Sequence, residues 1–248
     1  QPITAPPSLV RHPSYQGYLV MFGTGKYFED SDGNIDNSRA QSVYAIWDRK
    51  TKAERTNTPP NITRNDLLRQ AIESELVHSF DNDGNSTTHE VRTITENTPT
   101  WYKANATDTN NDSSVNHWGW YLDLKLGNTL AGEMMVNPMA ARGQVLMLST
   151  LTPNDDPCVD GVDIWAYGLN VASGGRTTFS VFDFSGDGSV DSGDTVNGAV
   201  ASGRKLAPSS GFTLSGDKMF STGDSMTVSF GPNSSGRQSW QALPEEYE

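Results

Sequence analysis

A twelve-residue stretch from Asp183 to Asp194 holds the residues best suited to chemistry, and that chemistry is cation binding. Oxygen-bearing side chains stand at positions 1, 3, 5, 9 and 12, and Gly188 stands at position 6. This is the spacing of a calcium loop, in which alternate residues turn inward and a glycine permits a sharp bend. The candidate ligands are Asp183, Ser185, Asp187, Ser189 through its backbone carbonyl, Asp191 and Asp194.

The surroundings of this stretch argue against an EF-hand. Residues 176–182 are rich in β-branched and aromatic side chains and predict a strand, and residues 195–203 show no helical pattern. Position 12 is Asp194 where an EF-hand has a bidentate glutamate. We therefore expect a loop between strands that orders its neighbourhood when calcium binds. The alternative is an acidic, glycine-rich surface turn that binds nothing, although four aspartates so close together would repel one another.

Two other acidic stretches have a related spacing. Residues Ser79–Glu90 place glycine at position 6 and glutamate at position 12, but position 1 is only a serine. Residues Asp30–Asp36 lack a ligand at position 1, where Phe28 stands. A polar turn is the simpler interpretation of both stretches, and a second cation site at Ser79–Glu90 stays open.

Other residues that could do chemistry lack a recognisable pattern. Gly23–Lys26 is not a phosphate-binding loop, because Val20 stands where the first glycine should be, and we expect a turn after a buried strand. The acidic pairs Asp155–Asp156 and Glu73 with Glu75 belong to no catalytic motif. The histidines have no metal-ligand spacing and are expected at the surface or at strand edges; they are His12, His78, His89 and His117.

The composition favours one large all-β domain, or the C-terminal fragment of one, over residues 1–248. The chain has 23 glycines, 13 prolines and only 19% charged residues, which is typical of short strands and many turns. The net charge of −12 argues against nucleic-acid binding, and no apolar run is long enough to span a membrane. Cys158 is the single cysteine, so we expect a free or buried thiol, or a pairing with another part of a longer secreted polypeptide.

Short strands ending in glycine turns are expected along the chain. Residues 15–30 and 41–48 predict a hairpin, and residues 50–115 read as a polar insertion. Within it, residues 64–77 fit either a helix or a long extended edge. A loosely repeated pattern of aromatic, aliphatic and aspartate residues suggests four-stranded propeller blades with a tryptophan-rich core. Further strands are predicted within 117–124, 133–138, 143–150, 163–170, 212–214 and 226–230.

Several segments resemble, in the same order, the C-terminal domain of PilY/PilC-type proteins of bacterial type IV pili. The resemblance implies a modified β-propeller with inserted polar loops. Residues 50–115 and the residues after 205 match the family only weakly. In that family, residues matching Asp183 to Asp191 bind calcium; the family often has asparagine at Ser185, and Asp194 is the least certain ligand. The similar segments are Gln1–Ala5, Phe22–Tyr27, Gln41–Asp48, Asp66–Leu68, Gly119–Asp123, Gly132–Glu133, Val136–Pro138, Pro153–Cys158 and Phe182–Asp191.

The resemblance also implies a function outside the cell. Such proteins act at the pilus tip, associated with the outer membrane, where they support pilus extension against retraction and mediate adhesion. The implied cofactor is Ca2+, and the implied partners are minor pilins, pilus tip components, and host or abiotic surfaces. No Arg-Gly-Asp sequence is present. Two alternatives remain: a quinoprotein-like propeller enzyme, which the lone cysteine disfavours, and a carbohydrate-binding surface module.

Overall fold

The computed structural model is built almost entirely of β-strands. It describes residues 1–13, 17–29, 32, 38–49, 61–101, 116–154, 161–207 and 211–232. No α-helix occurs in these ranges, and short 3-10 turns there include η2 (Arg64–Asp66) and η3 (Ser192–Asp194). None of the described residues forms a helix able to cross a membrane. The all-β prediction is confirmed.

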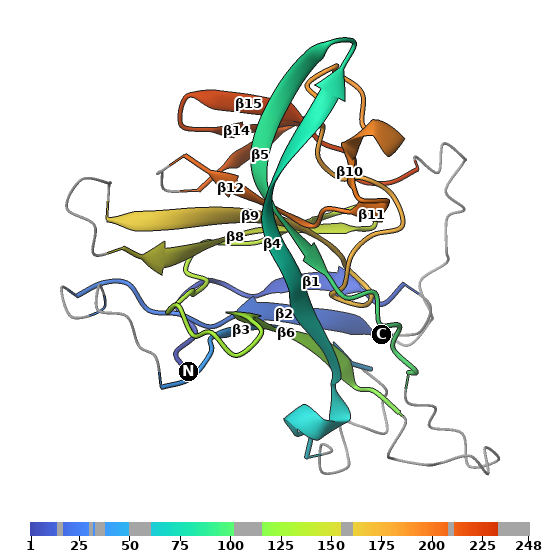
Figure 1. Ribbon diagram of the computed structural model, residues 1–248. Coiled ribbons are helices and arrows are strands. Elements are labelled where there is room, and N and C mark those ends of the chain that lie inside the picture. The colour runs from blue at the N-terminus through green and yellow to red at the C-terminus, as the bar shows by residue number, and fades with distance from the viewer. Residues whose placement is uncertain are drawn as a thin grey trace.

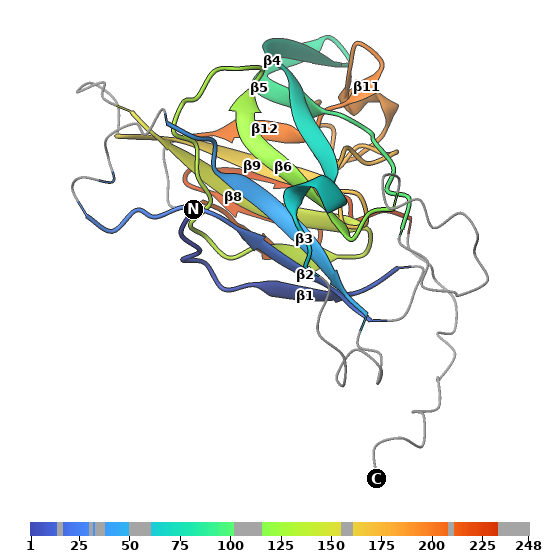
Figure 2. The ribbon, with the colours of Figure 1, turned by 90° about the horizontal axis from the view of Figure 1, so that it is seen from below.

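Ten strands form one continuous, strongly twisted sheet with the order β1-β2-β3-β6-β4-β5-β12-β9-β8-β7 (Figures 1 and 2). The two end strands, β1 and β7, contact each other, so the sheet nearly closes on itself. Two small sheets, β10-β11 and β13-β14-β15, lie beside it. The bounds are β1 Ser8–Arg11, β2 Tyr18–Gly23, β3 Ser42–Asp48, β4 Leu68–Asn82, β5 Asn85–Ile94, β6 Gly119–Leu126, β7 Ala140–Arg142, β8 Val145–Pro153, β9 Val162–Asn170, β10 Thr195–Val196, β11 Ala199–Val200, β12 Gly203–Leu206, β13 Thr213–Ser215, β14 Lys218–Ser221 and β15 Asp224–Thr227.

One parallel pairing joins the two halves of this sheet. Strands β1, β2, β3 and β6 are antiparallel neighbours, and so are β5, β12, β9, β8 and β7. Strand β4 pairs in parallel with β6 through Leu68–Ile72, and then antiparallel with β5 over most of its length. Because β4 bonds to both neighbours, the ten strands form one continuous sheet and are not divided into separate four-stranded blades.

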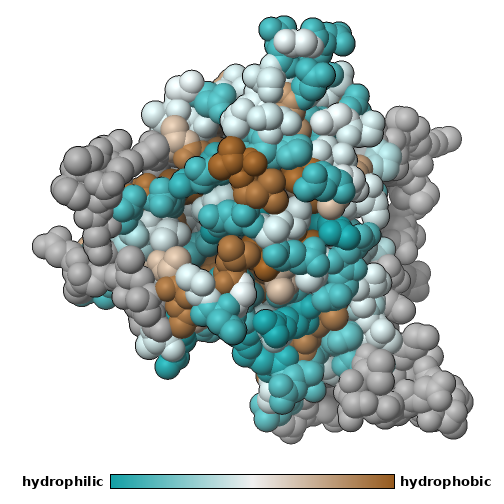
Figure 3. All heavy atoms as spheres, viewed as in Figure 1, coloured by the Kyte–Doolittle hydropathy of each residue, from teal (hydrophilic) through white to brown (hydrophobic). Residues whose placement is uncertain are grey.

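Residues 64–77, whose sequence fitted either a helix or a long extended edge, are mostly extended. The first residues form η2, and the rest is the fifteen-residue strand β4. Gln70 is fully buried there and bonds to the backbone of Asn97 and Ser173, which fixes the start of the strand. Beyond Ile72, β4 and β5 continue as a long hairpin that rises from the body in Figure 1. Figure 3 shows its tip to be mainly hydrophilic.

Two apolar cores lie on opposite sides of the central strands. Successive residues of β8 alternate between them: Leu146 and Leu148 belong to one core, and Val145 and Met147 to the other. This alternation follows from the two-residue period of a strand, and it explains why β8 is apolar on both faces. The predicted core role of tryptophan is confirmed for the buried Trp47, Trp101, Trp120 and Trp165.

The prediction that His12 lies at the surface or at a strand edge is wrong. His12 is only 3% exposed, and its ring lies 4.7 Å from the ring of Trp47 and 4.3 Å from that of Trp101, centre to centre. The two indoles come from segments far apart in sequence, so the sequence near His12 does not reveal its burial. Because burial penalises the charged imidazolium, the pKa of His12 falls to about 4.

A buried ion pair links β5, β9 and the segment before β7. Arg92 Nη1 donates to Glu133 Oε2 at 2.7 Å, and both residues are buried. The other Glu133 oxygen accepts from Thr150 Oγ1 at 2.6 Å and from the Tyr167 hydroxyl at 2.8 Å. The Arg92 guanidinium also stacks on the Trp165 ring, 3.8 Å from its centre. The two charges therefore have the hydrogen bonds that burial requires.

Acid should destabilise the fold through His12. The unfolded chain takes up a proton on this residue below about pH 6.5, whereas the folded chain does so only near pH 4. The free energy of unfolding should therefore decrease as the pH is lowered from about 6.5 to about 4, and His12 should account for up to about 3 kcal/mol of that decrease. Urea unfolding at pH 7 and pH 4.5 tests this, with His12→Gln as the comparison. An equal loss in the variant would contradict it.

Removal of one charge from the buried pair should lower the free energy of unfolding far more than removal of a charge from an exposed pair. Arg92→Met leaves Glu133 buried without its cation, and should lower the free energy of unfolding by about 3–5 kcal/mol. Arg176→Met is the matched control, because Arg176 pairs with Glu73 and Glu96, which are nearly half exposed. It should cost less than about 1 kcal/mol. Similar losses in the two variants, measured by urea unfolding, would refute the assignment.

Candidate metal site in the 183–194 loop

The predicted calcium loop is held between two parts of the fold. Phe182 and Phe184 are buried at its start, and Phe184 stacks on Phe80 of β4 with ring centres 4.8 Å apart. Thr87 of β5 donates to the Phe184 carbonyl at 2.5 Å. The backbone N–H of Asp183 donates to the Thr227 carbonyl of β15 at 3.1 Å. The loop therefore connects the long hairpin to the small three-stranded sheet.

The flanks of the loop differ partly from expectation. Residues 176–182 make no strand; the pairing there is an isolated bridge from Phe182 to Val228. After the loop, β10 and β11 form a short hairpin whose turn is Asn197-Gly198, both with positive φ. The expectation that no helix flanks the loop is confirmed for these described segments.

Asp183 organises the first half of the loop. Its carboxylate is buried and accepts the N–H of Gly186 at 2.8 Å and the N–H of Gly188 at 3.0 Å. The Ser185 hydroxyl approaches the same carboxylate at 3.4 Å. Gly186 and Gly188 both have positive φ, which L side chains rarely adopt, so these two glycines allow the backbone to wrap around the carboxylate.

Asp194 closes the loop from its other end. It is 1% exposed, and it accepts the N–H of Ser185 at 2.9 Å and the N–H of Asp191 at 3.0 Å. Burial raises the pKa of its carboxyl group, and the nearby negative charge of Asp183 raises it further. Asp183, Ser185 and Asp194 are thus brought together in the interior, although Asp194 was the least certain ligand in the sequence.

The remaining candidate ligands lie on the outside of the loop. Asp187 and Asp191 are exposed, and each accepts a nearby backbone N–H, from Ser189 at 2.7 Å and from Gly193 at 2.7 Å. Ser189 is also exposed. Within the described ranges, no three His, Cys, Asp or Glu side chains are grouped so that they could hold a metal ion. Of the six predicted ligands, the structure therefore brings three together in the interior: Asp183, Ser185 and Asp194.

The chemistry of this donor set suits calcium. Every candidate donor is a hard oxygen, and two of them are buried carboxylates, of which Asp183 raises the pKa of Asp194. A divalent cation would compensate both charges, and backbone N–H groups now satisfy them in part. Asp187, Ser189 and Asp191 are close in sequence to this pair and unobstructed by burial, so they are available as further ligands.

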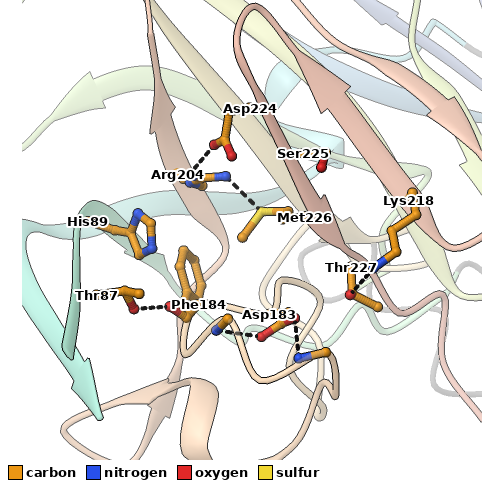
Figure 4. Close-up of a pocket in the computed structure, with 12 residues that line it drawn as sticks. Thr87, His89, Asp183, Phe184, Arg204, Lys218, Asp224, Ser225, Met226 and Thr227 are labelled. Carbon is orange, nitrogen blue, oxygen red and sulfur yellow. Dashed lines mark hydrogen bonds and ion pairs between the residues drawn. The ribbon is translucent and has the colours of Figure 1, made fainter. Parts of the chain in front are cut away.

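A pocket of about 270 Å³ opens beside the loop (Figure 4). Besides the loop, its walls come from β5, β12, β14 and β15, so it combines segments far apart in the chain. No single motif in the sequence joined these residues, because those outside the loop come from four separate strands: two from β5, one each from β12 and β14, and four from β15. The lining residues are Thr87, His89, Asp183, Phe184, Gly186, Gly188, Arg204, Lys218, Asp224, Ser225, Met226 and Thr227.

The other candidates from the sequence have structural explanations. Ser79–Glu90 is the distal part of the β4–β5 hairpin, and Asp83-Gly84 is its two-residue turn with positive φ at both positions. Gly23 ends β2, as expected for a turn after a buried strand. Glu73 and Glu75 form ion pairs with arginines. Cys158, Asp155–Asp156 and most of Asp30–Asp36 lie outside the described residues.

Comparisons with known proteins identify relatives along nearly the whole chain. The model of the PilY1 beta-propeller domain family matches residues 1–105. The type IV pilus biogenesis factor PilY1 of Pseudomonas aeruginosa strain UCBPP-PA14 is 47% identical over 252 aligned positions, which cover 99% of this chain and 21% of that protein. A PilY1 homolog of Xylella fastidiosa is 28% identical over 82% of this chain and 12% of its own length. The chain thus spans about a fifth or less of these relatives.

A solved structure shares the fold. The crystal structure of the Pseudomonas aeruginosa PilY1 C-terminal domain matches with a TM-score of 0.81 and 39% identity, over 94% of this chain and 45% of that chain. The resemblance predicted from the sequence motifs is confirmed, as is the modified β-propeller class. The family model, the identity and the shared fold together show that the chain belongs to the PilY1-type C-terminal β-propeller domains of type IV pilus biogenesis factors.

Proposed function

We propose that this domain is a calcium-binding, extracellular module of a type IV pilus biogenesis protein, and that it supports pilus extension against retraction and surface adhesion. The observation that carries the calcium assignment is the pair of buried carboxylates, Asp183 and Asp194, joined through Ser185 in one loop. The names of the relatives support the assignment to pilus biogenesis. They name no catalytic activity, and we assign none to this domain.

Calcium would be held by the oxygen ligands of the 183–194 loop. Asp183 and Asp194 would supply the buried carboxylates and Ser185 its hydroxyl, while Asp187, Asp191 and the Ser189 carbonyl would complete the set. The bound ion would neutralise the acidic cluster. The protein itself supplies the burial, the glycine-dependent bend and the hydrogen bond from Ser185 to Asp194 that holds the two ends of the loop together.

The anchors of the loop indicate what its ordering would affect. Phe184 stacks on Phe80 of the long hairpin, and Asp183 bonds to Thr227 of β15. A loop that is rigid in the presence of calcium would therefore fix the hairpin relative to the three-stranded sheet. We propose that the surface formed by these elements contacts minor pilins, other pilus tip components or an external surface, and that calcium controls its shape.

Calorimetric titration should detect one calcium ion per chain. Chelator-stripped protein is expected to bind calcium with a dissociation constant of about micromolar to millimolar. Asp183→Asn and Asp191→Ala should each weaken binding at least tenfold, because each removes a charged ligand. Asp81→Asn, at the tip of the hairpin, is the matched control and should leave the titration unchanged. Saturable binding that survives both loop variants would contradict the assignment, and loss of one of two ions in the control would identify a second site at Ser79–Glu90.

A domain exchange should test the assignment to pili. The C-terminal domain of Pseudomonas aeruginosa PilY1 can be replaced over its aligned part by this chain, and surface pili and twitching motility should be restored in a strain lacking the native protein. The same chimera with Asp191→Ala should give an altered number of surface pili, and Asp81→Asn should not. A chimera that is secreted and folded but restores neither property would refute the proposed role.

A further inference from the structure

The pocket beside the loop carries more cationic donors than the chain itself uses. Arg204 lies in its wall and is only 7% exposed. One of its terminal nitrogens pairs with Asp224 at 2.5 Å, and the other meets the sulfur of Met226 at 3.0 Å (Figure 4). A thioether is a weak acceptor. The Arg204 Nε has no acceptor among the described residues. A buried guanidinium that lacks strong hydrogen-bond acceptors on two of its three nitrogens is uncommon and needs an explanation.

A second cation stands in the same wall. Lys218 of β14 is exposed, and its ammonium group donates to the Thr227 hydroxyl at 2.7 Å. Within the described part of the chain it makes no ion pair with a carboxylate. The carboxylate of Asp183 also lines the pocket, but its two backbone hydrogen bonds come from N–H groups of its own loop. The two cations and the carboxylates of Asp183 and Asp224 balance in formal charge, so what the pocket offers is two cationic groups whose hydrogen-bonding capacity is incompletely used.

The rest of the pocket limits what can enter it. Phe184 and Met226 give it an apolar side, and Ser225 and Thr227 add polar groups at the β15 side. Its volume of about 270 Å³ is at the small end for ligand pockets, so it suits a single side chain or a chain terminus more than a large molecule. The carboxylates of Asp183 and Asp224 also line it, and they would repel a dianion more strongly than a single negative charge.

We propose that this pocket binds a carboxylate of a partner polypeptide, from an aspartate or glutamate side chain or from a C-terminus, with Arg204 and Lys218 as its cationic contacts. The Asp224 side chain is 41% exposed, so an incoming carboxylate can displace it from Arg204. Guanidinium groups favour carboxylates because two parallel hydrogen bonds can form. The inference uses none of the residues that would bind calcium through their side chains, apart from Asp183 as part of the wall.

Methionine-methyl NMR offers a direct test, because Met226 lines the pocket. The protein is labelled with 13C in its methionine methyl groups, and the Met226 signal is assigned with Met226→Leu. Three short peptides are added: one with glutamate and both ends blocked, the same peptide with glutamine, and one that lacks acidic side chains but has a free C-terminus. We expect saturable shifts of the Met226 signal with the first or third peptide, which separates the two carboxylate sources, and none with the second.

Charge variants identify the contacts. Lys218→Gln and Arg204→Gln should each weaken the peptide at least tenfold, whereas Asp224→Asn should tighten it by removing the competing carboxylate. Lys125→Gln on β6, away from the pocket, is the matched control and should change nothing. Lys218 is exposed, so its variant keeps the test valid if Arg204→Gln fails to fold. Equal shifts with the glutamine peptide, equal binding by Lys218→Gln and the control, or tighter binding of inorganic phosphate would each overturn the proposal.

Running every titration in chelator and again in calcium separates this inference from the proposed function. Carboxylate binding in chelator that depends on Lys218 supports the pocket even if no calcium binds. Calcium binding with no Met226 shift in either condition would overturn the pocket and leave the calcium assignment standing. A shift that occurs only in calcium would support both, and would show that the loop forms the competent wall of the pocket.

Discussion

The parallel pairing of β4 with β6 is the constraint on which the rest of this fold depends. It joins two antiparallel halves, one ending at β1 and the other at β7, into a single sheet. Parallel pairing between segments separated by about fifty residues requires a long connection, and the β4–β5 hairpin forms part of that connection. Because β4 continues past β6, its distal half projects over the 183–194 loop and places Phe80 against Phe184.

The candidate metal site depends on this placement. Asp183 and Asp194 are buried in a loop that contacts the β4–β5 hairpin through Phe184 and contacts β15 through the backbone of Asp183. Burial of two carboxylates is unfavourable unless hydrogen bonds or a cation compensate their charge. The loop N–H groups supply part of that compensation, and the raised pKa of Asp194 reflects what they leave uncompensated. This residual cost is the physical reason for proposing a cation in the loop.

The 183–194 loop forms one wall of the pocket that we propose to bind a carboxylate, so the two proposed ligands, calcium and a carboxylate, would bind at adjoining sites. Asp183 faces its own loop with its carboxylate and contributes to the pocket lined by Arg204 and Lys218. Ordering of the loop by an ion would therefore fix one side of the pocket. A domain built in this way could respond to calcium by changing its affinity for an acidic segment of another polypeptide, without any rearrangement of its main sheet.

The sequence by itself determined the all-β class, the β2–β3 hairpin and the family, and it located the loop that we propose as a calcium site. Each of these depends on local spacing or on ordered motifs, such as the alternation of oxygen ligands around Gly188. It did not determine the burial of His12 between Trp47 and Trp101, or the extended form of β4, whose pattern also fitted a helix. Only the tertiary structure buried Asp183 and Asp194 and placed Arg204 and Lys218 in the wall of one pocket, because burial and shared pockets arise from contacts between separate strands that no local pattern encodes.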